Sequence, residues 1–93
     1  MSISESDVLL LWPLPSKWMP HLVRVKNEYG NVYATFQLND HRIKLTWLKN
    51  YNTFAGKVSH KHPQTRRWRS SSWKYYRPQD LALLYQTWSN NDT

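Results

Sequence analysis

Apolar and polar side chains alternate along most of the chain between residues 21 and 59. A period of two, with many β-branched and aromatic residues, is typical of β-strands that bury one face. The strands are expected at residues 21–27, 32–38, 41–48 and 53–59. Turn sequences lie between them: Gly30-Asn31, Asn39-Asp40 and Asn50-Tyr51-Asn52. Because short turns connect antiparallel neighbours, the pattern predicts an antiparallel meander.

The alternation sorts the strand residues into two faces of the predicted sheet. The apolar face is expected to form the core with Val23, Val25, Val32, Ala34, Phe36, Leu38, Ile43, Leu45, Trp47, Phe54 and Val58. The opposite face carries Arg24, Lys26, Tyr33, Thr35, Gln37, Arg42, Lys44, Thr46 and Lys57. That face is polar and basic and is expected to meet solvent. Gly56 could mark a bulge that exchanges the two faces within the fourth strand.

The pattern changes to a helical period near the C-terminus. Apolar residues recur at i, i+3, i+4 and i+7 as Leu81, Leu84, Tyr85 and Trp88. Pro78 suits the first helical position, and Asp80 complements the positive end of the helix dipole. The sequence therefore predicts an α+β fold: a four- to five-stranded antiparallel meander with one C-terminal amphipathic helix packed on its apolar face.

Prolines interrupt the residues before the first strand. Pro13, Pro15 and Pro20 disfavour a regular element there and indicate an extended arm. Trp12, Leu14 and Trp18 in this arm either cover the core or form a docking motif for another protein; core cover is the favoured interpretation. We therefore expect a proline-punctuated N-terminal arm at residues 1–20 and a single basic domain at residues 21–93.

Length and composition narrow the class of protein. The 93 residues suffice for one hydrophobic core. The absence of cysteine excludes disulfides, thiolate zinc sites and a cysteine nucleophile. Glu5 and Asp7 stand where a signal peptide would be basic, and the apolar run from Val8 to Trp12 is too short to span a bilayer. These features predict a cytoplasmic protein without membrane contact, metal or cofactor.

Positive charge is concentrated in one part of the sequence. The chain has 13 Lys and Arg against six Asp and Glu. Residues 41–79 contain ten of these basic residues and no acidic one. Because like charges repel within a folded domain, such a block favours a polyanionic partner. The alternative is a basic surface that serves solubility alone.

Basic and aromatic residues interleave between His60 and Arg77, which suits nucleic acid, because arginine binds phosphate and aromatic rings stack on bases. Phosphate contacts are predicted for Arg66, Arg67, Arg69, Lys74 and Arg77, extended along the sheet by Arg42, Lys44 and Lys57. Stacking is predicted for Trp68, Trp73 or Tyr33. The serines at residues 70–72 would form a hairpin tip or an ordered loop. Alternatively Trp68, Trp73 and Tyr75 belong to a fifth and sixth strand, and at least one of these tryptophans is expected to be buried.

Two other classes of function compete with nucleic-acid binding. His60 and His62, with His41, could form a metal-free site that cleaves RNA, although the chain shows no evident catalytic carboxylate pair. A basic domain could equally dock on an acidic protein surface as a subunit or an inhibitor. The main hypothesis is a non-catalytic protein that binds DNA or RNA, and the acidic protein partner is the alternative.

Overall fold

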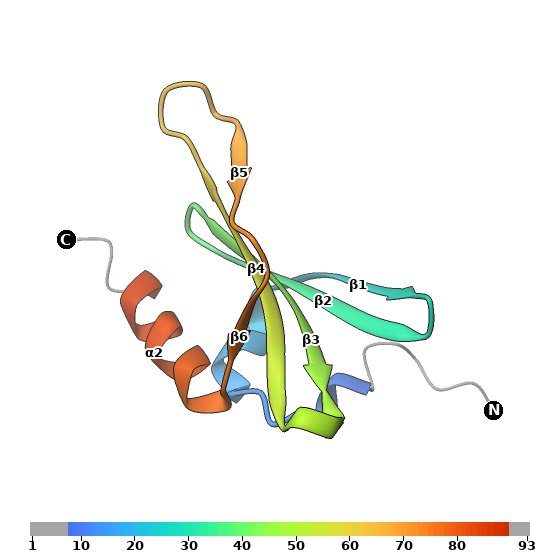
Figure 1. Ribbon diagram of the computed structural model, residues 1–93. Coiled ribbons are helices and arrows are strands. Elements are labelled where there is room, and N and C mark those ends of the chain that lie inside the picture. The colour runs from blue at the N-terminus through green and yellow to red at the C-terminus, as the bar shows by residue number, and fades with distance from the viewer. Residues whose placement is uncertain (1–7, 90–93) are drawn as a thin grey trace.

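The computed structural model describes residues 8–89, which form a six-stranded antiparallel sheet and one C-terminal helix (Figure 1). The strands are β1 (Leu22–Glu28), β2 (Asn31–Leu38), β3 (His41–Leu48), β4 (Thr53–Lys61), β5 (Trp68–Ser70) and β6 (Lys74–Tyr76). They lie in the order β1-β2-β3-β4-β5, and β6 also pairs with β4. The helix α2 spans Pro78–Ser89. The predicted α+β meander with a C-terminal helix is confirmed. No helix within residues 8–89 is long and apolar enough to cross a membrane.

Short turns with left-handed residues connect the first three strands. Tyr29 and Gly30 have φ values of 54° and 83° and form the two-residue turn between the paired residues Glu28 and Asn31. Positive φ at both central positions matches the right-handed twist of a hairpin, and glycine adopts it without steric cost. The turn thus lies one residue before the predicted Gly30-Asn31. Asn39, with φ 55°, serves the next two-residue turn.

The core lies between one face of the sheet and α2, and Trp18 is its central residue. The Trp18 side chain is 0 % exposed, and its Nε1–H donates a hydrogen bond to the Leu81 carbonyl at 3.1 Å. Its ring packs edge-on against Phe36, Tyr85 and Trp88, with centroids 5.8, 5.4 and 5.6 Å away. Edge-to-face pairs add about 0.5–1.5 kcal/mol each beyond the area that they bury. Trp18 therefore joins the sheet to the helix.

The segment before β1 coils rather than running extended. It forms two 3-10 helices, η1 (Leu9–Leu11) and η2 (Ser16–His21), with Pro20 inside the second. The expectation of an extended arm is thus wrong for residues 16–21, because the coil places Trp18 in the gap between sheet and helix. Trp12 is also buried and packs edge-on against Phe54. The interpretation of these tryptophans as core cover is confirmed.

The predicted sheet faces are correct except at two residues. Val23 was expected in the core but is 55 % exposed, because the β1–β2 register shifts between Leu22 and Arg24. Thr46 was expected in solvent but is buried, and its hydroxyl donates to the Val32 carbonyl at 2.9 Å. The other predicted core residues are buried or half-buried. Gly56 marks no bulge against β3, since it pairs regularly with Leu45.

The outer edge of β4 carries two short strands in succession. Ser59 pairs with Ser70 in β5, and Gly56 pairs with Lys74 in β6. Three steps along β4 thus face four steps along its partner, so residues 71–73 contain one extra residue, as in a β-bulge. The serines at 70–72 therefore lie at a strand break and not at a hairpin tip. The tip of the β4–β5 hairpin, which projects from the body of the domain, is formed by residues 62–67 (Figure 1).

The stability of this core depends on pH through His41. Its ring stacks on Trp88, with centroids 4.8 Å apart and planes 11° apart, and its buried Nδ1 has no hydrogen-bond partner within residues 8–89. Desolvation lowers the pKa of His41, the positive charge of a protonated His60 lowers it further, and Asp40 opposes both. The folded protein thus binds a proton less readily than the unfolded chain does. The contribution of His41 to stability is therefore fully present above the unfolded pKa of about 6.5 and is lost as the pH falls from there through the lower folded pKa.

We expect His41→Phe to reduce the decrease in melting temperature between pH 7 and pH 5, because phenylalanine keeps the stacked ring and removes the titrating group. Thermal unfolding followed by circular dichroism at several pH values measures this. His60→Gln is the matched control: it removes only the smaller Coulombic contribution and should retain most of the pH dependence. An unchanged slope in His41→Phe would show that other groups control the acid response.

Candidate nucleic-acid interface

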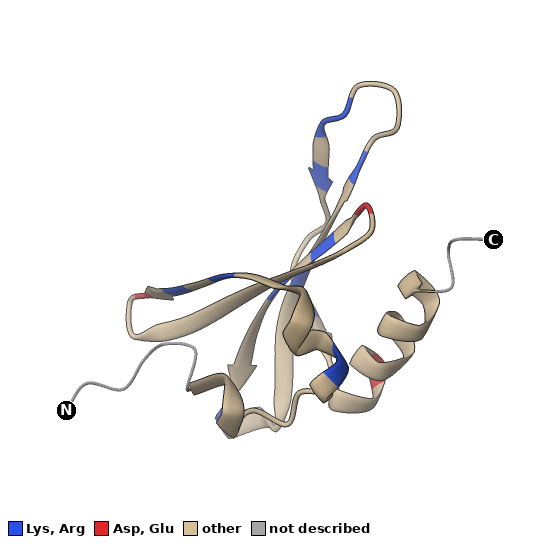
Figure 2. Cartoon of the chain, turned by 180° about the vertical axis from the view of Figure 1, so that it is seen from behind, with Lys and Arg blue, Asp and Glu red and all other residues tan. Residues whose placement is uncertain are grey.

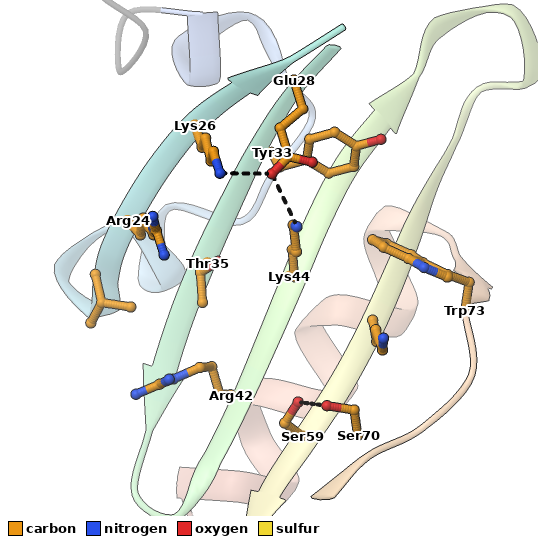
Figure 3. A pocket seen from close by; sticks show the side chains of 12 residues that line it. Arg24, Lys26, Glu28, Tyr33, Thr35, Arg42, Lys44, Ser59, Ser70 and Trp73 are labelled. Atoms are coloured by element: carbon orange, nitrogen blue, oxygen red, sulfur yellow. Dashed lines mark hydrogen bonds and ion pairs between the residues drawn. The ribbon is translucent and has the colours of Figure 1, made fainter. Parts of the chain in front are cut away.

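The sheet face opposite the core is hollowed and basic. A cavity of about 580 Å³ opens there over β1 to β4 and the strand break (Figure 3). We call it the basic hollow. It is lined by Val23, Arg24, Lys26, Glu28, Tyr33, Thr35, Arg42, Lys44, Lys57, Ser59, Ser70 and Trp73. Five of these side chains are cationic and only Glu28 is anionic. The hollow therefore has a positive electrostatic potential.

A row of cations crosses the hollow from strand to strand. Arg24 pairs with Thr35, Thr35 with Lys44, and Lys44 with Lys57, so the row runs from β1 to β4. Lys44 and Lys57 stand directly opposite each other, and like charges at such positions are destabilising. Within residues 8–89 neither Arg24 nor Lys57 forms an ion pair. The fold thus holds a cationic row whose two ends, Arg24 and Lys57, are uncompensated, at some cost in stability.

Glu28 is the internal counter-ion of the hollow. Its Oε1 lies 3.3 Å from the Lys26 ammonium and 3.7 Å from that of Lys44 (Figure 3). The hydrogen bond from Lys26 is the main reason that the pKa of Glu28 is lowered; desolvation opposes it, and the charges of Lys44 and Lys26 lower the pKa further. Glu28 is therefore ionised at neutral pH. A single carboxylate offsets two of the cations in part and leaves the others uncompensated.

Aromatic rings adjoin these cations. The Lys44 ammonium lies 4.8 Å from the centroid of the Tyr33 ring, and the Arg42 guanidinium lies 4.4 Å from that of Trp68. Arg42 is held further by a 2.7 Å hydrogen bond from Nη2 to Gln37 Oε1, while its buried Nε has no partner within residues 8–89. Cation–π contacts and this hydrogen bond orient the charged groups. Arg42 and Lys44 are therefore oriented before any ligand binds.

Trp73 reaches the hollow because of the strand break. Side chains alternate along a strand, so an unbroken continuation from Ser70 would turn Trp73 towards the core face. Ser71 stabilises the break: its N–H donates to the Val58 carbonyl at 2.7 Å, and its Oγ accepts from the Val58 N–H at 3.2 Å. The serine hydroxyl thus replaces the backbone partner that the bulge removes. Trp73 then lies in the lining, 6.1 Å from Tyr33 between ring centroids.

The structure brings together part of the predicted site. Tyr33, Arg42, Lys44, Lys57 and Trp73 line the hollow, and Trp68 lies against Arg42. Trp68 is half-buried and Trp73 is 45 % exposed, so the expectation that at least one of them is buried is wrong. The aromatic residue of this region that packs on the core is Tyr76.

The other predicted phosphate ligands lie outside the hollow. Arg66 and Arg67 are exposed at the hairpin tip, and Arg69 pairs with His60 on the side of β5 opposite to Trp68. Lys74 pairs with Gly56 at the outer edge, and the Arg77 backbone N–H donates to Asp80 at the start of α2. Figure 2 shows Lys and Arg spread over the strands and the hairpin, while α2 carries none.

Two cations of the hollow were absent from the predicted site. Arg24 and Lys26 lie in β1, outside the acid-free block of residues 41–79 that directed the site prediction. The alternation had already placed both on the same sheet face as Lys44. The predicted sheet face could therefore have identified Arg24 and Lys26. Closeness in sequence to the arginine-rich segment could not.

The histidines do not gather into one site. His41 and His60 are cross-strand neighbours with ring centroids 6.2 Å apart, whereas His62 lies at the hairpin tip. His62 Nδ1 accepts hydrogen bonds from the N–H groups of Gln64 and Thr65, which orders that tip. Residues 8–89 contain no group of three or more His, Asp or Glu side chains that could hold a metal ion.

No protein family, curated protein or solved structure compared with the chain shows a significant match. The function is therefore inferred from the geometry of the basic hollow.

Proposed function

We propose that this is a small non-catalytic nucleic-acid-binding protein that holds backbone phosphates in the basic hollow. The observation that carries the proposal is the Arg24-Lys44-Lys57 row, in which two lysines face each other without an intervening carboxylate. Like charges opposed across strands lower stability, and a bound anion would offset the repulsion between these two lysines. Phosphates spaced along a polynucleotide supply several negative charges to one row of cations.

The lining offers more than charge. Arginine can bind a phosphate through two parallel hydrogen bonds, and serine hydroxyls can bond phosphate oxygens. Ser59 and Ser70 line the hollow with their hydroxyls 2.7 Å apart (Figure 3). An incoming phosphate oxygen would compete with Glu28 for Lys26 and Lys44. The polar groups thus match a polyanion better than a neutral ligand.

The β4–β5 hairpin would extend the same interaction outwards. Arg66, Arg67 and Arg69 are exposed on it, and the tip is closed by backbone hydrogen bonds between His62 and Arg67 and between Arg66 and His62, each at 2.9 Å. Such exposed cations are screened by salt more strongly than cations in a hollow. We therefore assign the hairpin arginines a supporting part in phosphate binding, and Lys74 and Arg77 a weaker one at the edge.

The test replaces Lys44 and Lys57 with Ala and measures fluorescence titrations with short single-stranded DNA, duplex DNA and RNA at two salt concentrations. Binding at low salt should weaken about 100-fold, from about 1.5 kcal/mol per lost charge-assisted contact. The fold should remain intact, because the substitutions relieve a repulsion.

The matched control is Lys17→Ala with Lys49→Ala, which removes two exposed cations outside the hollow. This variant should keep nearly the wild-type affinity. A triple variant with Ala at Arg66, Arg67 and Arg69 should lose less affinity than the Lys44 and Lys57 variant does. The same affinity in hollow and control variants would refute the site. Absence of binding to any nucleic acid at low salt would refute the function.

A further inference from the structure

Two exposed aromatic side chains lie at the outer side of β4: Trp73, which lines the basic hollow, and Tyr75, which pairs with Ala55 next to it. Trp73 is 45 % exposed, and Tyr75 is 75 % exposed. Tyr76 packs on the core, so its neighbour Tyr75 lies on the polar face with Lys57, because side chains alternate along a strand. We call Trp73 and Tyr75 the aromatic edge. The extra residue of the strand break is what turns this edge towards the cations.

The faces of the aromatic rings in the hollow are not covered by one another. Tyr33 and Trp73 are tilted by 57°, so neither covers the face of the other. Within residues 8–89 neither Trp73 nor Tyr75 stacks on another ring. Exposed apolar side chains that are rimmed by polar residues are typical of binding sites. A ligand that suits them carries flat apolar groups next to anionic ones.

We propose that the hollow binds an unpaired polynucleotide strand, with phosphates along the Arg24-Lys44-Lys57 row and bases stacked on the aromatic edge. This inference rests on the proposed function and specifies its substrate class. The row crosses three inter-strand steps, about 14 Å, and the aromatic edge lies at its β4 end. A strand laid across the sheet therefore meets both features.

A duplex fits this arrangement poorly. Its bases are stacked on each other and present only their edges in the grooves, so a ring beside the hollow has no base face to contact. An unpaired strand exposes both base faces and phosphates, and single-strand binders combine a positive groove with stacking rings. The combination of cations and open rings on one concave face thus favours the unpaired form.

The experiment compares wild type with Trp73→Ala and Tyr75→Ala, using a single-stranded DNA, a single-stranded RNA and a blunt DNA duplex of equal length, each over a series of salt concentrations. Wild type should bind an unpaired strand at least about 10-fold more tightly than the duplex. Each aromatic variant should lose about 5- to 100-fold in single-strand affinity. Tyr51→Ala, which removes an exposed ring outside the hollow, should lose nothing.

Salt dependence separates stacking from charge. The aromatic variants should keep the wild-type slope of log affinity against log salt, whereas Lys57→Ala should reduce the slope by about 0.7. Tyr75 is so exposed that its variant should fold even if Trp73→Ala does not, which circular dichroism checks. Tighter binding of the DNA or the RNA strand identifies the preferred sugar, and either result supports the inference.

Equal affinity for duplex and single strand, or aromatic variants that bind single strands like wild type, would overturn the inference and leave the proposed function standing. If the wild type bound no nucleic acid at all, both the inference and the proposed function would be overturned.

Discussion

Trp18→Ala is expected to lower the melting temperature by about 12–40 °C. Truncation of a buried tryptophan costs about 3–5 kcal/mol, and in a domain of this size each kcal/mol shifts the melting temperature by about 4–8 °C. Trp18 is fully buried and contacts rings from both β2 and α2, so its removal leaves a cavity between sheet and helix. It also removes the donor to the Leu81 carbonyl. Thermal unfolding followed by circular dichroism measures the loss.

Two further variants test this expectation, one at the same position and one at an exposed tryptophan. Trp18→Phe keeps a ring in the core and loses the Leu81 hydrogen bond and some volume, so it should lie between wild type and Trp18→Ala. Trp73→Ala removes the same side chain from an exposed position and should change the melting temperature by only a few degrees. If Trp18→Ala unfolded within about 5 °C of wild type, Trp18 would not be the centre of the core.

The strands and the helix could be predicted from the sequence because each depends on the periodicity of neighbouring residues along the chain. A period of two sorts strand residues by face whichever strand lies alongside, and Ala34, Phe36, Ile43 and Leu45 are buried as predicted. The helical spacing from Leu81 to Trp88 likewise needs no knowledge of the partner. The place of the N-terminal tryptophans was harder, because proline signals an irregular backbone without indicating where it packs.

The positions of Val23 and Trp73 depend on pairing between strands. A shift near Leu22 turned Val23 outwards, and an extra residue near Ser71 turned Trp73 towards the hollow. Neither event is marked in the sequence by the usual glycine, since a serine hydroxyl completes the second break. The sequence pointed instead to arginines that are neighbours along the chain. The hollow gathers residues from five strands, and the register shows which of them lie side by side.

Lys57→Glu should raise stability while it abolishes most binding. The new carboxylate would stand directly opposite Lys44, so a repulsive cross-strand pair becomes an attractive one worth about 0.2–1 kcal/mol. The melting temperature should therefore rise by about 1–8 °C. Affinity for a short single-stranded oligonucleotide at low salt should fall about 1000-fold, because Lys57 is lost, Lys44 is neutralised and the carboxylate repels phosphate.

Lys49→Glu is the matched control, since it makes the same charge change at an exposed position outside the hollow. It should reduce affinity only slightly, through the net charge, and should not raise the melting temperature. A Lys57→Glu variant that binds like this control, or that is less stable than wild type, would contradict the role of the cationic row. Opposite changes in stability and affinity would mean that Lys57 serves binding at the expense of the fold, as expected of a functional residue.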